Sequence, residues 1–431
     1  MPYSLTDRVE PMTRGDIRAI RPSIEALMAE STRINADRAG EYWYPLSLAT
    51  YQAEEVLEAL DSMVTFRTSM WEKTRRFEEA FGAKYGGEAI MVNSGSSADL
   101  LIAFGLHELS GGPLRSGDEV LVPAVTWPTQ LWSVLMAGFH ATLVDVDPVT
   151  LNIDFEDLER KVTPKTRALS LVHLMGNPVK MDRVLDFCDR HNLVLFEDCC
   201  ESLGAKWGDR YVGTFGEAAS FSFFFSHHIT TMEGGMILTR NAELAERFRL
   251  LRAHGWSRNL KHPPAVVEDL DPRYTFLNWG FNVRPTELQA GFGLVQLERS
   301  DGFQEFRDQN ARLAIERLRR HSEVLSLMSV SDGGRCSWFA LPILVSEAAG
   351  FTRDELTAFL EANGVETRPV VTGNLARHPA VGNFASSMSV GDLPGADRVH
   401  VQGLYVGLHP EDSVVGLNRL FDLIDAFVVN H

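Results

Sequence analysis

Three segments of the chain place chemically useful side chains directly after short apolar runs. The first, NSGSSADL at residues 93–100, opens a stretch with a helical pattern. Ser96 and Ser97 there set two hydroxyls beside the free backbone N–H groups of a helix start, an arrangement that favours a bound phosphate. A plain helix cap explains the same residues about as well, so this segment alone is only a weak indication of a phosphate site.

The second segment, FEDCCES at residues 196–202, carries Asp198 and Glu201 after an apolar run. A carboxylate held at the end of a central strand can pair with the protonated ring nitrogen of a pyridine cofactor, which keeps the ring able to accept electrons. Helix capping by Asp198 explains this segment equally well when it is taken alone.

The third segment, FSFFFSHHITTMEGG at residues 221–235, contains the adjacent His227 and His228. Imidazole moves protons near neutral pH, so either histidine is a candidate acid or base. A histidine pair is more often structural than catalytic, and the position after an apolar run shifts that balance only modestly.

These segments need strands to hold them, and the sequence supplies a regular series of apolar runs. Near-continuous apolar character is typical of strands buried on both faces of a parallel sheet. Segments such as MDRVLDFCDRH between the runs have helical periodicity. We therefore expect an α/β fold with a mainly parallel sheet and ligand sites at the carboxyl ends of its strands. The expected strands are 89–92, 119–122, 142–146, 168–174, 193–198, 220–225 and 235–239.

The pattern changes along the chain and predicts three parts. Residues 1–85 form an irregular, partly helical N-terminal arm, residues 86–299 a large three-layer α/β/α domain, and residues 300–431 a smaller α/β domain. The last part is expected to begin with a long charged helix.

Composition narrows the classes of function. With 431 residues and 45% hydrophobic side chains the chain can bury a large core, and a net charge of −17 argues against a nucleic-acid partner. No apolar run reaches the length of a membrane span or signal peptide, so we expect a cytoplasmic protein. The spacing of the four cysteines matches no zinc site, so we expect buried thiols and no bound metal. The cysteines are Cys188, Cys199, Cys200 and Cys336.

Taken together and in this order, the three segments resemble the DegT/DnrJ/EryC1/StrS family of sugar aminotransferases. The resemblance runs from about residue 40 to the C-terminus and includes VNSGSSADLL, VLVPAVTWPTQ, VDVDPVTLNID, VHLMGNPVKMD, LFEDCCESLGAKW, GFNVRPTELQAGFGLVQLE and DLPGADR. It implies the fold type I aspartate-aminotransferase architecture and a pyridoxal 5′-phosphate (PLP) cofactor.

The resemblance also implies a cofactor pocket. Asp198 would meet the ring nitrogen with Glu201 close by, and Trp127 would stack on the ring. Asn282 would reach the phosphate from a neighbouring subunit, which implies a homodimer with shared active sites. The phosphate would be held by Ser96, Ser97 and Ser222.

One departure from the family decides the expected chemistry. Relatives that transfer amino groups have a lysine where this sequence has His227, and imidazole cannot form the Schiff base that tethers PLP. Counting back from Glu233 favours His227 over His228 for this position. The change is similar to that in the 3-dehydratase branch, which acts on nucleotide-linked 4-keto-6-deoxyhexoses with pyridoxamine phosphate (PMP) and glutamate as amino donor.

A second match supports that branch. TRPVVTGNLARHP at residues 367–379 resembles its TR-x-x-x-x-GNL segment, which makes Arg368, Asn374 and Arg377 candidates near the sugar or its diphosphate, with ordinary surface charge as the alternative. The iron–sulfur enzymes of the branch place cysteines ahead of the segment aligned with GFN, and residues 255–282 contain none, so no iron–sulfur cluster is expected.

Two other readings stay open at this point. One is an aminotransferase of the same family adapted to histidine, and the other is a catalytically silent cofactor- or sugar-binding protein. Two further departures, Met232 where a glycine is usual and Asn177 where many relatives have glutamine, bear on substrate choice.

Overall fold

The computed structural model describes residues 14–38, 42–263 and 270–431, and its centre is an eight-stranded sheet. The spatial order of its strands is β1 (Glu88–Val92), β9 (Gly235–Thr239), β8 (Ala218–Ser222), β5 (Val194–Asp198), β4 (Thr166–Val172), β2 (Glu119–Pro123), β3 (His140–Val144) and β14 (Met388–Ser389). Neighbouring strands run parallel from β8 to β14 in this order, whereas β9 is antiparallel to both β1 and β8.

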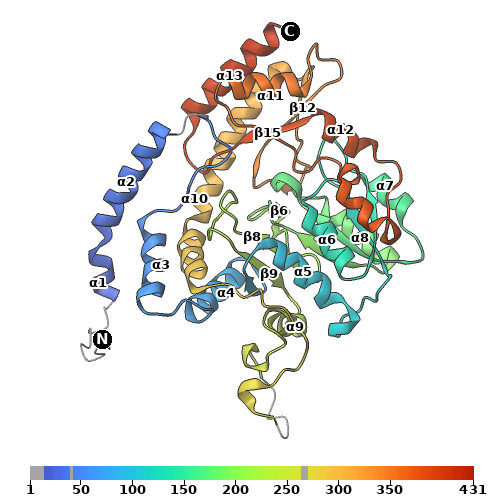
Figure 1. The fold of residues 1–431 in the computed structure, drawn as a ribbon. Coiled ribbons are helices and arrows are strands. Elements are labelled where there is room, and N and C mark those ends of the chain that lie inside the picture. Colours follow the sequence, from blue (N-terminus) through green and yellow to red (C-terminus); the bar gives the residue numbers. More distant parts are fainter. Residues whose placement is uncertain (1–13, 39–41, 264–269) are drawn as a thin grey trace.

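Helices cover both faces of this sheet (Figure 1). Alternate residues of one strand enter different cores: Val120 and Val122 of β2 join one apolar cluster, and Leu121 between them joins another with Leu169 and Phe187. Both faces of a parallel strand are thus buried, which confirms the expected α/β/α layers. The covering helices are α5 (Gly95–Leu106), α6 (Pro128–Met136), α7 (Phe155–Lys161), α8 (Met181–His191) and α9 (Ala242–Arg252).

Three strands end earlier than the sequence predicts. β3 ends at Val144 rather than at residue 146, and β4 ends at Val172 rather than at residue 174. β8 ends at Ser222, so the expectation that this strand continues to residue 225 is wrong. The partner strand β9 begins at Gly235, which pairs with Ser222, so later residues of the aromatic run have no strand beside them. Phe224 and Phe225 are instead exposed in a loop.

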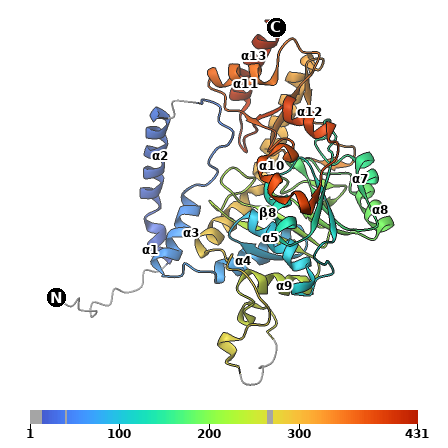
Figure 2. The ribbon, with the colours of Figure 1, turned by 45° about the vertical axis from the view of Figure 1, so that its right-hand side comes forward.

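The N-terminal part is helical in the described residues. Figures 1 and 2 both show α1 (Arg14–Ala19) and α2 (Arg21–Arg38) on the outer side of α3 (Ala53–Val64), away from the large sheet. α4 (Glu72–Tyr85) begins against the carboxylate of Glu287, which accepts hydrogen bonds from the backbone N–H groups of Trp71, Lys73 and Thr74. A buried carboxylate at a helix N-terminus satisfies donors that have no partner within the helix.

A long helix, α10 (Glu287–Leu318), connects the large sheet to a small antiparallel one. The domain boundary expected between residues 299 and 300 lies inside this helix, and β14 from the C-terminal part adds to the large sheet. The small sheet has the order β10 (Leu325–Leu327), β12 (Ala340–Val345), β15 (Gly403–Gly407) and β13 (Arg368–Pro369). Its helices are α11 (Arg353–Ala362), α12 (Pro394–Gln402) and α13 (Val414–Val429).

A third, short sheet consists of β11 (Gly334–Arg335), β6 (Lys206–Trp207) and β7 (Arg210–Tyr211). Among the helices of the described ranges, none combines the length and apolar character that a bilayer crossing requires.

Candidate active site

The first turn of α5 and the end of β8 lie against each other. Ser94 caps α5 by accepting a hydrogen bond from Ser97 N at 3.1 Å, and Ser97 Oγ donates to Asn93 Oδ1 at 2.6 Å. A Cβ on Gly95 would lie 2.5 Å from Ser222 Cβ and 3.1 Å from Cys200 Sγ, so only glycine allows this approach. The helix start therefore brings together the three serines predicted to hold a phosphate.

Two acids lie at the end of β5 beside this turn: Asp198 is the last residue of the strand and is buried, and Glu201, three residues later, is half-buried. Asp198 is 4% exposed and accepts a hydrogen bond from Cys200 N at 2.9 Å; burial raises the pKa of its carboxyl. Glu201 Oε2 accepts one from Met175 N at 3.0 Å, and burial raises the pKa of Glu201 to about 7. At neutral pH Glu201 is thus close to half protonated, because its pKa and the pH nearly coincide.

A buried histidine–carboxylate pair holds the end of β5 in place. His173 Nε2 lies 3.0 Å from Glu197 Oε2, and both side chains are fully buried. Glu197 also accepts hydrogen bonds from the N–H groups of Gly213 and Gly216. Sequence reasoning did not single out this pair, although Glu197 precedes Asp198 directly.

His227 lies in the loop after β8, between two aromatic rings. Its ring centroid is 6.0 Å from that of Phe224 and 5.2 Å from that of Phe339, both in edge-to-face geometry. Burial lowers the pKa of His227 to about 4, while the backbone of Cys200 and Ser222 acts in the opposite direction. Its Nδ1 is buried and has no hydrogen-bond partner within the described residues. The ring is therefore a neutral base at neutral pH, near the end of β8 and the residues after β5.

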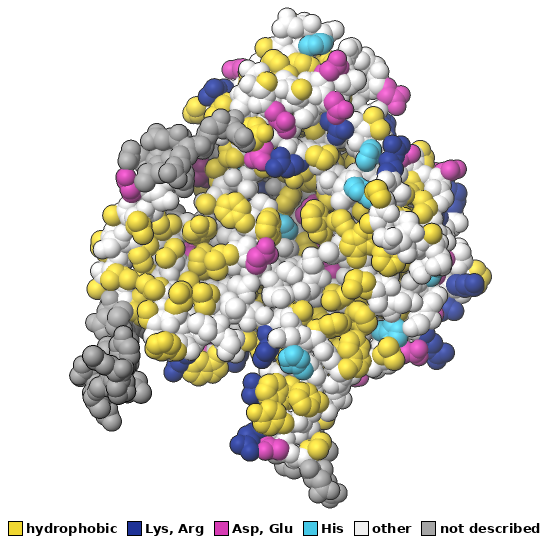
Figure 3. All heavy atoms as spheres, viewed as in Figure 1, with side chains coloured by type: hydrophobic (Ala, Val, Ile, Leu, Met, Phe, Trp, Pro, Cys, Tyr) yellow, Lys and Arg dark blue, Asp and Glu magenta, His cyan; other side chains and the backbone are white. Residues whose placement is uncertain are grey.

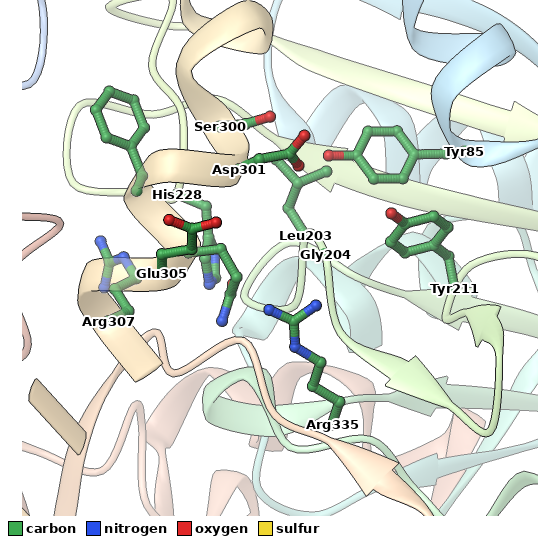
Figure 4. A pocket seen from close by; sticks show the side chains of 12 residues that line it. Tyr85, Leu203, Gly204, Tyr211, His228, Ser300, Asp301, Glu305, Arg307 and Arg335 are labelled. Atoms are coloured by element: carbon green, nitrogen blue, oxygen red, sulfur yellow. The ribbon is translucent and has the colours of Figure 1, made fainter. Parts of the chain in front are cut away.

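His228 lies in a different environment. Its Nε2 is 3.1 Å from the carbonyl oxygen of Ser337, and its ring lines a cavity of about 340 Å³ (Figure 4). Other walls of the cavity are Tyr85, Tyr211, Asp301, Glu305, Arg307 and Arg335, and none of the predicted cofactor residues contributes. Both histidine rings pack near Phe339, but only His228 is bonded to Ser337 and lines this cavity.

The backbone conformation of Met232 explains why relatives usually have a glycine at this position of the loop. Its φ is +68°, a left-handed conformation in which a Cβ is strained. Its N–H donates to Thr230 Oγ1 at 3.0 Å, which keeps the turn closed. The methionine thus preserves the backbone path that glycine would follow and adds an exposed side chain.

Trp127 precedes α6 and its ring is 55% exposed, so a face is open for stacking. The loop around it is held by the TGNL segment of the C-terminal part. Thr372 Oγ1 donates to the Thr126 carbonyl and Leu375 N to the Ala124 carbonyl, both at 2.9 Å. The segment that sequence reasoning assigned to substrate binding therefore packs directly on the loop that carries Trp127.

The three predicted substrate residues have different surroundings. Asn374 is buried, and its Nδ2 donates to Asp397 Oδ1 at 2.7 Å. Arg377 Nε donates to the same oxygen at 2.7 Å. Both side chains are engaged within their own domain, so their first role in this conformation is to hold the loop after β13.

Arg368 differs because it lies on β13, where it pairs with Tyr405 of β15 in the register of the small sheet. Its guanidinium forms an ion pair with Glu366 at 2.8 Å. Burial raises the pKa of Tyr405 to about 12, and Glu201 raises it further, which places the Tyr405 hydroxyl within the field of that acid. Tyr405 thus joins Arg368 to the acids after β5, a connection that only the tertiary structure reveals.

Asn282 is exposed, and its Oδ1 accepts a hydrogen bond from Arg284 Nε at 2.9 Å. The next residue, Val283, accepts a backbone hydrogen bond from Asn93, so this segment borders the start of α5. Asp99, one turn into α5, is a buried acid that sequence reasoning passed over. The signal was present, because a carboxylate on the buried side of a helix is rare without a function.

All four cysteines are free thiols, as expected, and burial raises the pKa of each. Asn177, where a glutamine is usual, is fully buried and donates to the carbonyls of Thr150 and Ser329. Its amide therefore supports neighbouring loops.

A large, mainly parallel sheet joined by a long helix to a small antiparallel sheet is the fold of the PLP-dependent aminotransferases. The model of the DegT/DnrJ/EryC1/StrS aminotransferase family matches residues 48–416, and the chain belongs to this family.

Individual relatives show which branch of the family the chain resembles. GDP-4-keto-6-deoxy-D-mannose 3-dehydratase of Yersinia pseudotuberculosis is 35% identical over 390 residues, which cover 88% of this chain and 98% of that protein. The structure of the E. coli enzyme of that name with bound hydrated PLP has a TM-score of 0.85 at 32% identity, covering 89% of this chain and 99% of the other. A structure of the 3-dehydratase with a trapped PLP-glutamate geminal diamine gives 0.84 at 32% identity, with coverage of 88% and 99%. These likenesses confirm the expected family and fold.

Proposed function

We propose that this protein is a PLP/PMP-dependent 3-dehydratase that removes the hydroxyl on carbon 3 of a nucleotide-linked 4-keto-6-deoxyhexose. Glutamate is the amino donor. In the balanced reaction, the sugar and glutamate give the 3-deoxy-4-ketosugar, 2-oxoglutarate and ammonia. The names of the relatives, and the PLP-glutamate adduct in one of their structures, support this substrate class and donor.

The residues fit a pyridine cofactor with a phosphate arm. The α5 start with Ser96, Ser97 and Ser222 is a suitable phosphate site, because a helix N-terminus favours an anion. Asp198 is buried with no lysine or arginine ion pair in the described part of the chain, which suits a protonated ring nitrogen. When bound, the cofactor supplies an amino group for the keto carbon and an electron sink.

The observation that carries the proposal is His227, in the place where a transaminase needs a lysine. Its neutral imidazole can accept a proton at the unpartnered Nδ1 and return it to the departing hydroxyl. His228 bonds to the backbone at Ser337 and lies against another cavity, which favours His227 as the acid–base group. Phe224 and Phe339 shield the ring from water on its edges.

Substrate binding is proposed on the side of the small domain. Arg368 offers an exposed guanidinium on β13, beside Tyr405 of β15. Asn374 and Arg377 contribute by holding the loop through Asp397.

The decisive experiment supplies the purified protein with PMP, glutamate and a panel of GDP-, CDP- and dTDP-linked 4-keto-6-deoxyhexoses. Mass spectrometry of the sugar nucleotides should show loss of one oxygen with release of ammonia. Retention of nitrogen in the sugar would mean an aminotransferase instead. Unchanged sugars across the panel, with PMP bound, would support the silent binding protein.

The homodimer and the cytoplasmic location are further parts of the proposal. Large hydrophobic side chains are exposed on the single chain, among them Phe66, Trp71, Phe224 and Phe225. Hydrophobic side chains extend over much of the face in Figure 3, as a surface covered by a second copy requires. Sedimentation tests the dimer, and cell fractionation tests the location.

A further inference from the structure

Two buried carboxyl groups meet between α5 and the end of β5. Asp99 is 9% and Asp198 is 4% exposed. A carboxylate oxygen of each and the sulfur of Cys200 all lie within 4.8 Å of one another. Among the described residues, no lysine or arginine forms an ion pair with either acid, so nothing neutralises a second negative charge there.

The groups facing the two acids decide which one is charged. Thr129 Oγ1 of α6 donates to Asp99 at 3.2 Å, and the Ser220 hydroxyl of β8 bonds to both acids. Asp198 alone also receives the backbone N–H of Cys200, and His173 stabilises its charge. Cys199 and Cys200 add no charge, because burial raises their thiol pKa values well above the ordinary range.

Two carboxyl groups that are buried from water and lie this close together cannot both be ionised at neutral pH. Burial and the charge of Asp198 raise the pKa of Asp99 well above its ordinary value, and burial also raises the pKa of Asp198. The proton therefore resides on the acid with fewer donors.

We propose that Asp99 and Asp198 share one proton carried by Asp99, so that Asp99 positions Asp198 as a single negative charge opposite the cofactor ring nitrogen. The shared proton is a property of the protein alone. Only its use toward the ring nitrogen rests on the proposed function.

The first test uses the protein without cofactor. The infrared difference spectrum of wild type minus Asp99→Asn at neutral pH should show one protonated carboxylic-acid C=O band, whereas wild type minus Asp209→Asn, an exposed control, should show none. Absence of the band from the Asp99 difference would overturn the proposal. Asp99→Ser serves as a second variant with the same expected band, and far-UV circular dichroism checks that each variant is folded.

The second test is the pH dependence of thermal unfolding. Asp99 keeps its proton in the folded state and loses it on unfolding, so wild-type stability falls as pH rises above the ordinary aspartate pKa of about 4. Relative to wild type, Asp99→Asn should therefore gain melting temperature between about pH 5 and about pH 8. A difference that does not change with pH would contradict the proposal.

The third test separates the shared proton from the cofactor. Asp99→Asn keeps one charge on Asp198 and should bind PMP within about threefold of wild type, whereas Asp198→Asn should bind at least about tenfold more weakly. If Asp99→Asn loses as much affinity as Asp198→Asn, the assignment of the charge is wrong. If wild type binds no PMP while the infrared band is present, the proposed function fails and the shared proton stands.

Discussion

At the scale of single residues, the proposed chemistry depends on the imidazole of His227 in an apolar setting. Phe224 and Phe339 flank the His227 ring, and burial keeps that ring neutral. A neutral base beside a carboxylate-bound pyridine ring is the arrangement that proton transfer requires.

Replacing His227 with Asn should lower kcat for sugar deoxygenation by about 10²–10⁴-fold, the usual range for a lost acid–base group. PMP binding should change little, because Asn keeps the volume and removes only proton transfer. The matched variant His228→Asn, one residue away, should retain most activity. The measurement is deoxysugar formation by mass spectrometry, and equal losses in both variants would refute the assignment.

The pH profile should reflect the depressed pKa of His227. A base with a pKa of about 4 stays unprotonated at higher pH, so kcat/KM should fall only as pH decreases toward about 4. An ordinary histidine would give an acidic limb near 6.5. Glu201 titrates near 7, so the profile is measured in wild type and in Glu201→Gln, which removes any contribution from that acid. An acidic limb near 6.5 in both proteins would contradict the prediction.

At the scale of elements, the strand ends and their loops set the site. β8 ends at Ser222 because its partner β9 begins at Gly235, and the intervening loop carries His227. Within that loop the strained Met232 is the clearest departure from local preference.

Met232→Gly should leave stability unchanged or raise it by up to about 1 kcal/mol, because relief of left-handed strain offsets the flexibility of glycine. The control is Met136→Gly, another exposed methionine but in the last turn of α6, which should cost about 0.5–1 kcal/mol. Urea unfolding measures both. Destabilisation of Met232→Gly by as much as the control would show that the loop conformation differs.

At the scale of the whole molecule, α10 and the chain's C-terminal part join the two sheets at the site. Arg307 on α10 is buried and donates to the carbonyls of Trp338, Phe339 and Leu408, which ties the helix to the end of the small sheet where β12 begins and β15 ends. The small sheet in turn presents Arg368 and Tyr405 toward the acids after β5.

A shared active site can be tested with mixed dimers. If Asn282 of one protomer serves the site that contains His227 of its partner, hybrids of His227→Asn and Asn282→Ala contain one site with both native residues. Mixing the two variants after dissociation should therefore recover activity above the sum of the separate proteins. If the activity of the mixture only equals the sum of the two separate variants, either both residues belong to the same chain's site or Asn282 is not part of the site. The control mixes His227→Asn with Asp198→Asn. Because both residues belong to the same chain's site, each site of a hybrid lacks one of them, and no activity should be recovered.

Sequence alone determined the parts whose signal is local. Apolar runs predicted the strands, since burial on both faces requires continuous hydrophobicity. The motif around His227 predicted the family and its departure from transamination. The helix start at residues 93–100 was predicted correctly, because capping residues are recognisable within a few positions; the phosphate site there stays a prediction.

Only the tertiary structure decided which distant groups meet. It placed Asp99 beside Asp198, gave His228 a cavity that His227 does not line, and ended β8 where its partner begins. The physical reason is that burial, charge pairing and strand partnership depend on residues far away in the chain, so no local pattern encodes them. The surroundings of Asn374 also could not be predicted from the sequence, because its hydrogen-bond partner Asp397 lies on another element.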